Sequence, residues 1–179
     1  VDYGVRATAS LADVFLREGH RVALLSYGRA LERTFPGYGK VQRERILHAL
    51  ARARTGDSMV FESFHYLPSR FFPSHSQLVI VTPLMQEDVS VLIRLRARGY
   101  RLLIVSPDPV AFEARWMPDD AASTLAVRIS QMERTLLLRQ LRRYDIRVVD
   151  WKVDKALDQV IHTSLIKTRR TSRMLRGIP

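Results

Sequence analysis

The sequence predicts an α/β protein: a three-layer α/β/α sandwich of the Rossmann-like type with a mostly parallel sheet. Two short runs rich in Val, Ile and Leu, at residues 77–82 and 100–105, end in Thr82-Pro83 and Ser106-Pro107. A helix-patterned segment separates them. Apolar runs bounded by turn residues and separated by helices are typical of consecutive parallel strands. Ligands collect at the carboxyl ends of such strands, so a functional site is expected at these two turns.

The first third of the chain predicts two helices and two strands. Apolar residues recur there at helical spacing in two segments, and turn residues bound two short apolar runs. In order, these patterns predict a helix at 5–18, a strand at 21–26, an antiparallel edge strand at 31–35 before a Pro36-Gly37 turn, and a helix at 41–54.

The remainder alternates strands and helices. Residues 77–82, 100–105 and 146–149 are predicted strands, and residues 87–98 and 153–165 are predicted helices. A long helix is expected to reach Arg143, with Asp119, Asp120 and Ser123 as possible N-caps. Its apolar positions at helical spacing are expected to face the core. They are Leu125, Ile129, Met132 and Leu136.

The composition is that of one ordinary globular domain, expected over residues 1–166 and followed by a basic tail at 167–179. The chain has 179 residues, of which 46% are hydrophobic. No apolar stretch approaches the roughly 20 residues that span a bilayer, so we expect no membrane insertion by this chain. Cysteine is absent, which fits a cytoplasmic protein or the soluble part of a membrane-anchored one.

The net charge of +11 is partly concentrated at the C-terminus. From residue 166 onward there are five cations and no acid, which leaves +6 for the rest of the chain. Such a tail is usually solvated, but it can also bind nucleic acid or an anionic surface, and both alternatives stay open. The candidate anion-binding residues are Lys167, Arg169, Arg170, Arg173 and Arg176.

Several words of the sequence occur in an order that resembles a von Willebrand factor A-like domain. More narrowly, the chain is similar to the uncharacterised family of such domains associated with MoxR-type AAA+ ATPases. The order and spacing of these words carry the resemblance across most of residues 5–151. The matching words are VRATASLA at residues 5–12, RVALLSYG at 21–28, PGYGK at 36–40, SQLVIVTPL at 76–84 and VVDW at 148–151.

The resemblance implies a divalent-metal site, but the chain departs from it at all three ligand groups. The first-strand Asp-x-Ser-x-Ser motif is absent, the second loop offers Gly39-Lys40 without a Thr, and the third position is Pro83. We therefore expect a degenerate metal site, with no metal and no cofactor. The family's first strand also looks missing. It is central in the strand order 3-2-1-4-5-6, so the chain is a fragment, has lost its N-terminus, or closes its sheet without that strand.

The function that the resemblance implies is a non-enzymatic protein-interaction domain that acts with a MoxR-type AAA+ ATPase in complex assembly. No nucleophile–base pair is visible, and the five histidines fall on separate predicted elements. The contact surface is expected at the carboxyl edge of the sheet, where Lys40 and Asp108 should be exposed. The candidate partner-binding residues are Tyr38, Lys40, Thr82, Asp88, Ser106 and Asp108. The alternative is a nucleic-acid or anionic-surface binder acting through the basic tail.

Overall fold

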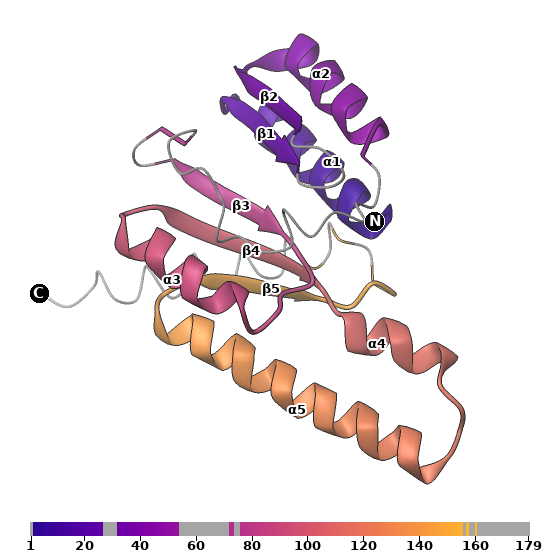
Figure 1. The fold of residues 1–179 in the computed structure, drawn as a ribbon. Coiled ribbons are helices and arrows are strands. Elements are labelled where there is room, and N and C mark those ends of the chain that lie inside the picture. Colours follow the sequence, from indigo (N-terminus) through magenta and orange to yellow (C-terminus); the bar gives the residue numbers. More distant parts are fainter. Residues whose placement is uncertain are drawn as a thin grey trace, which may run out of the picture. The chain divides into compact units, whose positions relative to one another are not determined.

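The computed structural model describes residues 2–26, 32–53, 72–73, 76–155, 157 and 160 (Figure 1). The described elements form two sheets, one with strands β1 and β2 and one with strands in the order β3-β4-β5. The chain divides into two compact units, residues 1–68 and residues 69–179. Each unit is an α/β arrangement of its own, with helices packed on its sheet.

The first unit contains two helices and an antiparallel pair of strands. In chain order these are α1 (Asp2–Arg17), β1 (Val22–Ser26), β2 (Glu32–Gly37) and α2 (Gly39–Ala51). The helices pack on each other through Ala12 and Leu16 of α1 and Ile46 and Leu50 of α2. Val22 and Leu24 of β1 pack against the same cluster. Apolar burial between the helices and one face of the strand pair therefore stabilises this unit.

Gln42 donates hydrogen bonds to the backbone where the antiparallel pair is irregular. The register of β1 against β2 shifts between Val22 and Leu24, which leaves carbonyl groups outside the regular ladder. The buried side chain of Gln42 on α2 donates from Nε2 to the carbonyl of Val22 at 2.8 Å and to that of Phe35 at 2.7 Å. A Cβ at Gly37 would lie 2.5 Å from Oε1 of Gln42, so a side chain at this position would displace the Gln42 amide from these hydrogen bonds.

The second unit has a parallel sheet with helices packed on one of its faces (Figure 1). Its sheet strands are β3 (Gln77–Val81), β4 (Arg101–Pro107) and β5 (Arg147–Trp151). Between them lie α3 (Asp88–Ala97), α4 (Pro109–Glu113), the short 3-10 helix η4 (Ala114–Trp116) and α5 (Ala121–Arg143). The neighbouring strands run parallel in an unbroken register, which confirms the α/β class and a parallel sheet.

The core of this unit surrounds β4, the middle strand. Ile104 and Val105 of β4 are fully buried, as is typical of the apolar middle strand of a parallel sheet. Leu92 of α3 and Leu141 of α5 are also fully buried. The C-terminal half of α5 thus packs on the sheet, whereas most of its N-terminal half is exposed.

Three sequence predictions about local structure are wrong. Pro36 and Gly37 do not form a turn but belong to β2, and β4 continues through Ser106 and Pro107. Proline is compatible with both places because it needs no ladder donor at an edge strand or a strand end. The apolar residues expected to face the core from the long helix are exposed instead. They are Leu125, Ile129, Met132 and Leu136.

The last error follows from the apolar residues of α5 lying on two sides. Leu137, Leu138 and Leu141 are buried and occupy the side of the helix that packs on the sheet. Helical spacing identifies a stripe, but it does not say which of two stripes faces the core. Most of the helix expected at residues 153–165 and the whole basic tail lie outside the described residues, and the expectation of one domain over residues 1–166 stays a prediction.

Candidate functional site

The carboxyl edge of the parallel sheet brings together three strand ends. Strand β3 ends just before Thr82, β4 ends just before Asp108, and β5 ends at Trp151. The register places Ser106 beside Asp150 and Pro107 beside Trp151. The backbone N–H of Asp108 donates to the carbonyl of Trp151 at 2.9 Å, which extends the ladder by one bond. This edge is where the sequence predicted a site.

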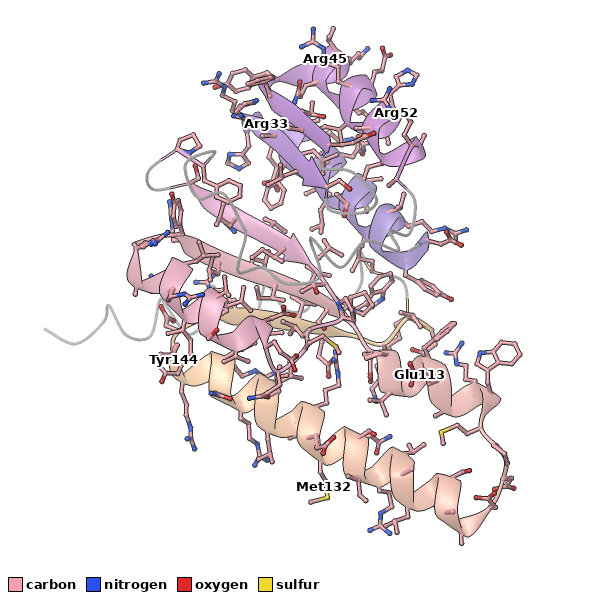
Figure 2. All side chains as sticks on the ribbon, viewed as in Figure 1. Arg33, Arg45, Arg52, Glu113, Met132 and Tyr144 are labelled. Atoms are coloured by element: carbon pink, nitrogen blue, oxygen red, sulfur yellow. The ribbon has the colours of Figure 1, made fainter. Side chains whose placement is uncertain are left out.

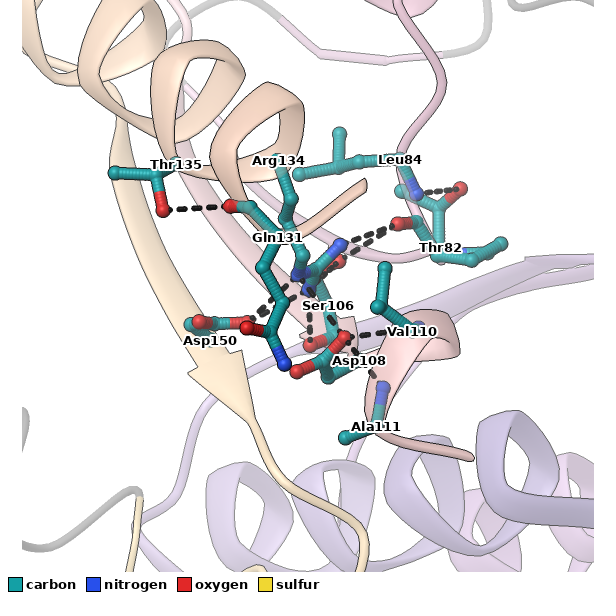
Figure 3. A network of polar contacts seen from close by, with 11 residues as sticks. Thr82, Leu84, Ser106, Asp108, Val110, Ala111, Gln131, Arg134, Thr135 and Asp150 are labelled. Atoms are coloured by element: carbon teal, nitrogen blue, oxygen red, sulfur yellow. Dashed lines mark hydrogen bonds and ion pairs between the residues drawn. The ribbon is translucent and has the colours of Figure 1, made fainter. Parts of the chain in front are cut away.

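Arg134 of α5 connects all three strand ends (Figure 3). Its Nη2 donates to Oδ1 of Asp150 at 2.7 Å and its Nε to the same oxygen at 3.1 Å. Its Nη1 donates to the carbonyl of Pro83 at 3.1 Å. Its Nε also lies 3.4 Å from Oδ1 of Asp108, and the side chains of Arg134 and Asp108 are each only 9% exposed. We call Arg134, Asp108, Asp150, Ser106 and the Pro83 carbonyl the Arg134 cluster.

Ser106 is fully buried, and its hydroxyl both donates and accepts a hydrogen bond within this cluster. Its hydroxyl donates to the carbonyl of Pro83 at 3.0 Å. The hydroxyl oxygen of Ser106 also accepts a hydrogen bond from Nη2 of Arg134 at 3.0 Å, and the carbonyl of Ser106 accepts one from Nη2 at 3.3 Å. A serine nucleophile needs a base to receive its proton, and here the proton points at a carbonyl. The geometry therefore suits a structural hydroxyl rather than a reactive one.

Besides its contact with Arg134, Asp108 is the N-cap of α4. Its Oδ1 accepts the backbone N–H of Val110 at 3.0 Å and that of Ala111 at 3.2 Å. Pro109 occupies the first helical position, where its fixed φ and missing N–H suit the start of a helix. Asp108 is buried, and its carboxylate is used in hydrogen bonds to the start of α4. The expectation that it is exposed is therefore wrong.

The loop after β3 is held in an unusual conformation by local side chains. Leu84 is buried and has a φ of 63°, in the left-handed region that costs a bulky residue about 1–2 kcal/mol. Its backbone N–H lies 3.4 Å from Oγ1 of Thr82. Buried Asp88, at the start of α3, accepts the backbone N–H of Met85 at 2.9 Å. This loop leaves Pro83 exposed and the side chain of Met85 61% exposed at the edge.

The charge of the Arg134 guanidinium is compensated within the cluster. One guanidinium lies against two carboxylates, and each of its three nitrogens donates to a protein oxygen. Such a guanidinium has little capacity left for an incoming anion, since its fork of donors is already directed at acceptors. Its positive charge also opposes a divalent cation next to Asp108 and Asp150. The arrangement ties the strand ends to α5 rather than presenting a reactive group.

The structure places the six candidate partner-binding residues in two units. Thr82, Asp88, Ser106 and Asp108 lie at the carboxyl edge described above, and all except Thr82 have buried side chains. Tyr38 and Lys40 belong to residues 1–68, where both are exposed at the N-terminal end of α2. The five candidate anion-binding residues of the basic tail lie outside the described part of the chain.

Sequence reasoning missed the two residues that organise the edge, Arg134 and Asp150. Asp150 directly precedes the end of β5, so the carboxyl-edge argument that selected Asp108 applied equally to it. Arg134 lies in register with Val127, Leu137 and Leu141 on the side of α5 that packs on the sheet. A single charge on an otherwise apolar helical face is the signal that could have identified it.

The described residues contain neither a cluster of metal ligands nor a helix suited to span a membrane. Among these residues, no three or more His, Asp or Glu side chains gather where they could hold a metal ion. Within the same residues, no helix is both long and apolar enough to cross a membrane. Comparisons of the chain with family models, with curated proteins and with solved structures found no match.

Proposed function

We propose that this chain is a non-enzymatic protein-interaction domain of the von Willebrand factor A-like type, with a degenerate metal site, that acts with a MoxR-type AAA+ ATPase. The resemblance of the sequence is the source of the partner class. The observation that carries the proposal is the Arg134 cluster, which closes the carboxyl edge with protein groups and leaves an exposed loop at Pro83 and Met85. A closed edge with an exposed loop suits contact with a protein surface.

The strand order within each sheet supports the proposed fold. Removing the first strand from the order 3-2-1-4-5-6 leaves the pairs 3-2 and 4-5-6. These correspond to β2 beside β1 and to β3-β4-β5. In addition, among the described residues β3 is an end strand of its sheet, and its residues, Gln77–Val81, carry no charge. Edge strands are usually protected by charges, so an uncharged apolar edge favours a further strand beside it, as the family's first strand would be.

The charge distribution supports the proposal of a degenerate metal site. The carboxylates at the edge, Asp108 and Asp150, are both ion-paired to Arg134. A divalent cation would have to displace that guanidinium or bind beside it. We therefore expect calorimetric titration with Mg²⁺ or Mn²⁺ to show no one-to-one site of micromolar affinity. Saturable binding that is lost in Asp150→Asn would contradict this part of the proposal.

The edge loop can be tested directly with the partner class. A purified MoxR-type AAA+ ATPase from the same organism would be captured on the immobilised chain. We expect Met85→Glu to reduce capture at least tenfold, because it places a charge in the centre of the proposed contact. Met117→Glu is the matched control, since Met117 is also an exposed methionine. Equal capture by wild type and Met85→Glu would remove the edge loop from the contact surface.

Lys40 tests the candidate partner-binding residues that belong to the first unit. Lys40 and Arg45 are both exposed on α2, five residues apart and hence on different sides of the helix. If Lys40 contacts the ATPase, Lys40→Glu weakens capture while Arg45→Glu, with the same change of charge, does not. Equal losses in both variants would indicate a general effect of charge rather than a specific contact. No capture by the wild-type chain would refute the proposed partner.

A further inference from the structure

Helix α5 exposes an apolar stripe on the side away from the sheet. Four large side chains form it: Leu125 is 57% exposed, Ile129 48%, Met132 68% and Leu136 62%. Figure 2 shows Met132 pointing away from the sheet. We call these four residues the outer stripe. Contiguous exposed apolar residues on one helix face typically mark a contact with another protein.

The spacing of the outer stripe is that of a coiled coil. Its members are separated by four, three and four residues, which is the alternation of positions a and d in a heptad repeat. Ile129 and Leu136 then occupy a positions, and Leu125 and Met132 occupy d positions. Ala122 occupies the preceding a position, so the seam covers residues 122–136 and about 21 Å of helix. Arg139 at the next d position ends it.

One pair of a and d residues in the outer stripe has the types that favour two strands. A β-branched residue at a with Leu at d is the combination that parallel two-stranded coils prefer, and Ile129 with Leu125 provides it. The helix is also formed already, because its C-terminal half packs on the sheet through buried Leu137, Leu138 and Leu141. A short seam on a preformed helix therefore does not bear the cost of nucleating that helix.

The flanking charges identify the occupant of the stripe. Arg128 precedes the a position of Ile129 and is a g residue, whereas Glu133 follows the d position of Met132 and is an e residue. In a parallel two-stranded coil, a g residue faces the e residue five positions later on the other helix. Arg128 of one copy would thus face Glu133 of the second copy, and symmetry repeats the pair. Both side chains are exposed.

We propose that α5 pairs in parallel with α5 of a second copy of this chain through the outer stripe. An antiparallel arrangement would oppose g to g and e to e, placing Arg128 near Thr135 and Glu133 near Ala126, with no opposite-charge pair. The charges of Arg128 and Glu133 therefore favour both self-association and the parallel orientation. This inference does not depend on the proposed ATPase partner.

Sedimentation of the full chain over a concentration series tests self-association. We expect a monomer–dimer equilibrium, and we expect Ile129→Glu to raise the dissociation constant more than tenfold. The control is Thr124→Glu, which adds the same charge at an exposed position of α5 outside the stripe. Circular dichroism of each variant checks that the monomer is folded. A wild-type chain that remains monomeric throughout the series overturns the proposal.

A charge exchange tests the pairing of Arg128 with Glu133. Arg128→Glu and Glu133→Arg should each weaken the dimer, because each brings two pairs of like charges together. The double variant should recover most of the wild-type affinity. In an antiparallel dimer or a dimer through another surface, the double variant would show no such recovery, and the proposed pairing would be wrong.

A single cysteine reports the orientation, and the chain has no cysteine to interfere. In the parallel dimer, residue 125 lies beside residue 125 of the second copy, so Leu125→Cys should form an intermolecular disulfide on mild oxidation. In an antiparallel dimer these residues would be separated by about 16 Å along the helix, too far for a disulfide. Cross-linking only in a mixture of Leu125→Cys and Leu136→Cys chains would establish the antiparallel form and overturn the proposal.

Discussion

The two sides of α5 carry similar apolar residues but meet different surroundings. The inner side has buried Leu137, Leu138 and Leu141, and among them lies Arg134 with its ion pairs to the strand ends. The outer side has leucine, isoleucine and methionine that remain largely exposed. Composition does not distinguish the two sides. The polar group does, because a buried guanidinium can exist only where oxygens are arranged to receive it.

This difference separates two uses of one helix. The inner side is fixed by apolar burial and by the hydrogen bonds of Arg134, so it contributes to the stability of the unit. The outer side contributes little to folding of the single chain, since its side chains stay in water. Substitutions of equal chemistry on the two sides should therefore have very different effects on the free energy of unfolding.

The largest difference is expected for a leucine pair. Leu141→Ala should lower the free energy of unfolding by about 4 kcal/mol, because Leu141 is fully buried and leaves a cavity. Leu136→Ala, on the outer stripe, should change it by no more than about 0.5 kcal/mol. Urea denaturation at a concentration where the chain is monomeric measures both. Similar losses for the two variants would show that the outer stripe is buried in the folded monomer.

Arg134→Ala is expected to cost about 3 kcal/mol, near the lower end of the range for breaking a buried ion pair. The lower end applies because the side chain of Asp150 is 32% exposed and water can partly solvate it. Arg134→Lys should recover only part of the loss, since an ammonium cannot reproduce the forked contacts. Arg139→Ala, an exposed change on the same helix, is the control. An Arg134→Ala protein as stable as the control would mean that the cluster contributes no net stability.

Asp108→Ala should cost about 2 kcal/mol, because it removes both the N-cap of α4 and a contact with Arg134. Asp108→Asn should cost less, since asparagine is an equally good N-cap that lacks only the charge. Thermal unfolding of the two variants separates the cap from the ion pair. If both variants lost the same stability, the charge of Asp108 rather than its capping would be the important property.

The sequence was sufficient for the elements that depend on local pattern. The runs predicted at residues 77–82 and 100–105 correspond to β3 (Gln77–Val81) and β4 (Arg101–Pro107). They were found because consecutive aliphatic residues next to Ser/Thr-Pro pairs are a local signal, although β4 continues through its pair. Asp120 was also among the expected N-caps, and its side chain accepts the backbone N–H of Ser123 at 2.7 Å. Local chemistry determines both features, so neither needs knowledge of the tertiary structure.

The sequence indicated the sheet edge at which the candidate site lies, but not the side chains that form its hydrogen-bond network. Of the six residues expected at the carboxyl edge, four lie at the strand ends of the second unit, whereas Tyr38 and Lys40 belong to the first unit. The four are Thr82, Asp88, Ser106 and Asp108. The carboxyl-edge rule did not indicate that Arg134, 26 residues beyond Asp108 in the sequence, would bury a guanidinium between them. Nor could the pattern of α5 say which stripe meets the sheet. Both facts depend on long-range packing, for which a single sequence gives no direct signal.

The smallest predicted effect concerns pH and the exposed N-terminus of α5. Hydrogen bonds from the backbone N–H and the side chain of Ser123 lower the pKa of Asp120 below its ordinary value. The charged form is therefore favoured by folding. Its contribution to stability is present above the pKa of the unfolded chain, about 3.9, and is lost as the pH falls through the lower pKa of the folded form.

Asp120→Asn isolates this contribution, because asparagine keeps the cap and removes only the charge that the helix dipole favours at this end. At neutral pH the variant should melt slightly below the wild type. The gap should narrow as the pH falls below about 4, and added salt should reduce it because Asp120 is exposed and its field is screened. Thermal melts from neutral to acidic pH, at low and at high salt, measure the gap. If the difference in melting temperature stayed constant with pH, it would arise from the geometry of the cap and not from the charge of Asp120. The exposed end of α5 would then differ from its inner side, where the charge of Arg134 and its hydrogen-bond geometry act together.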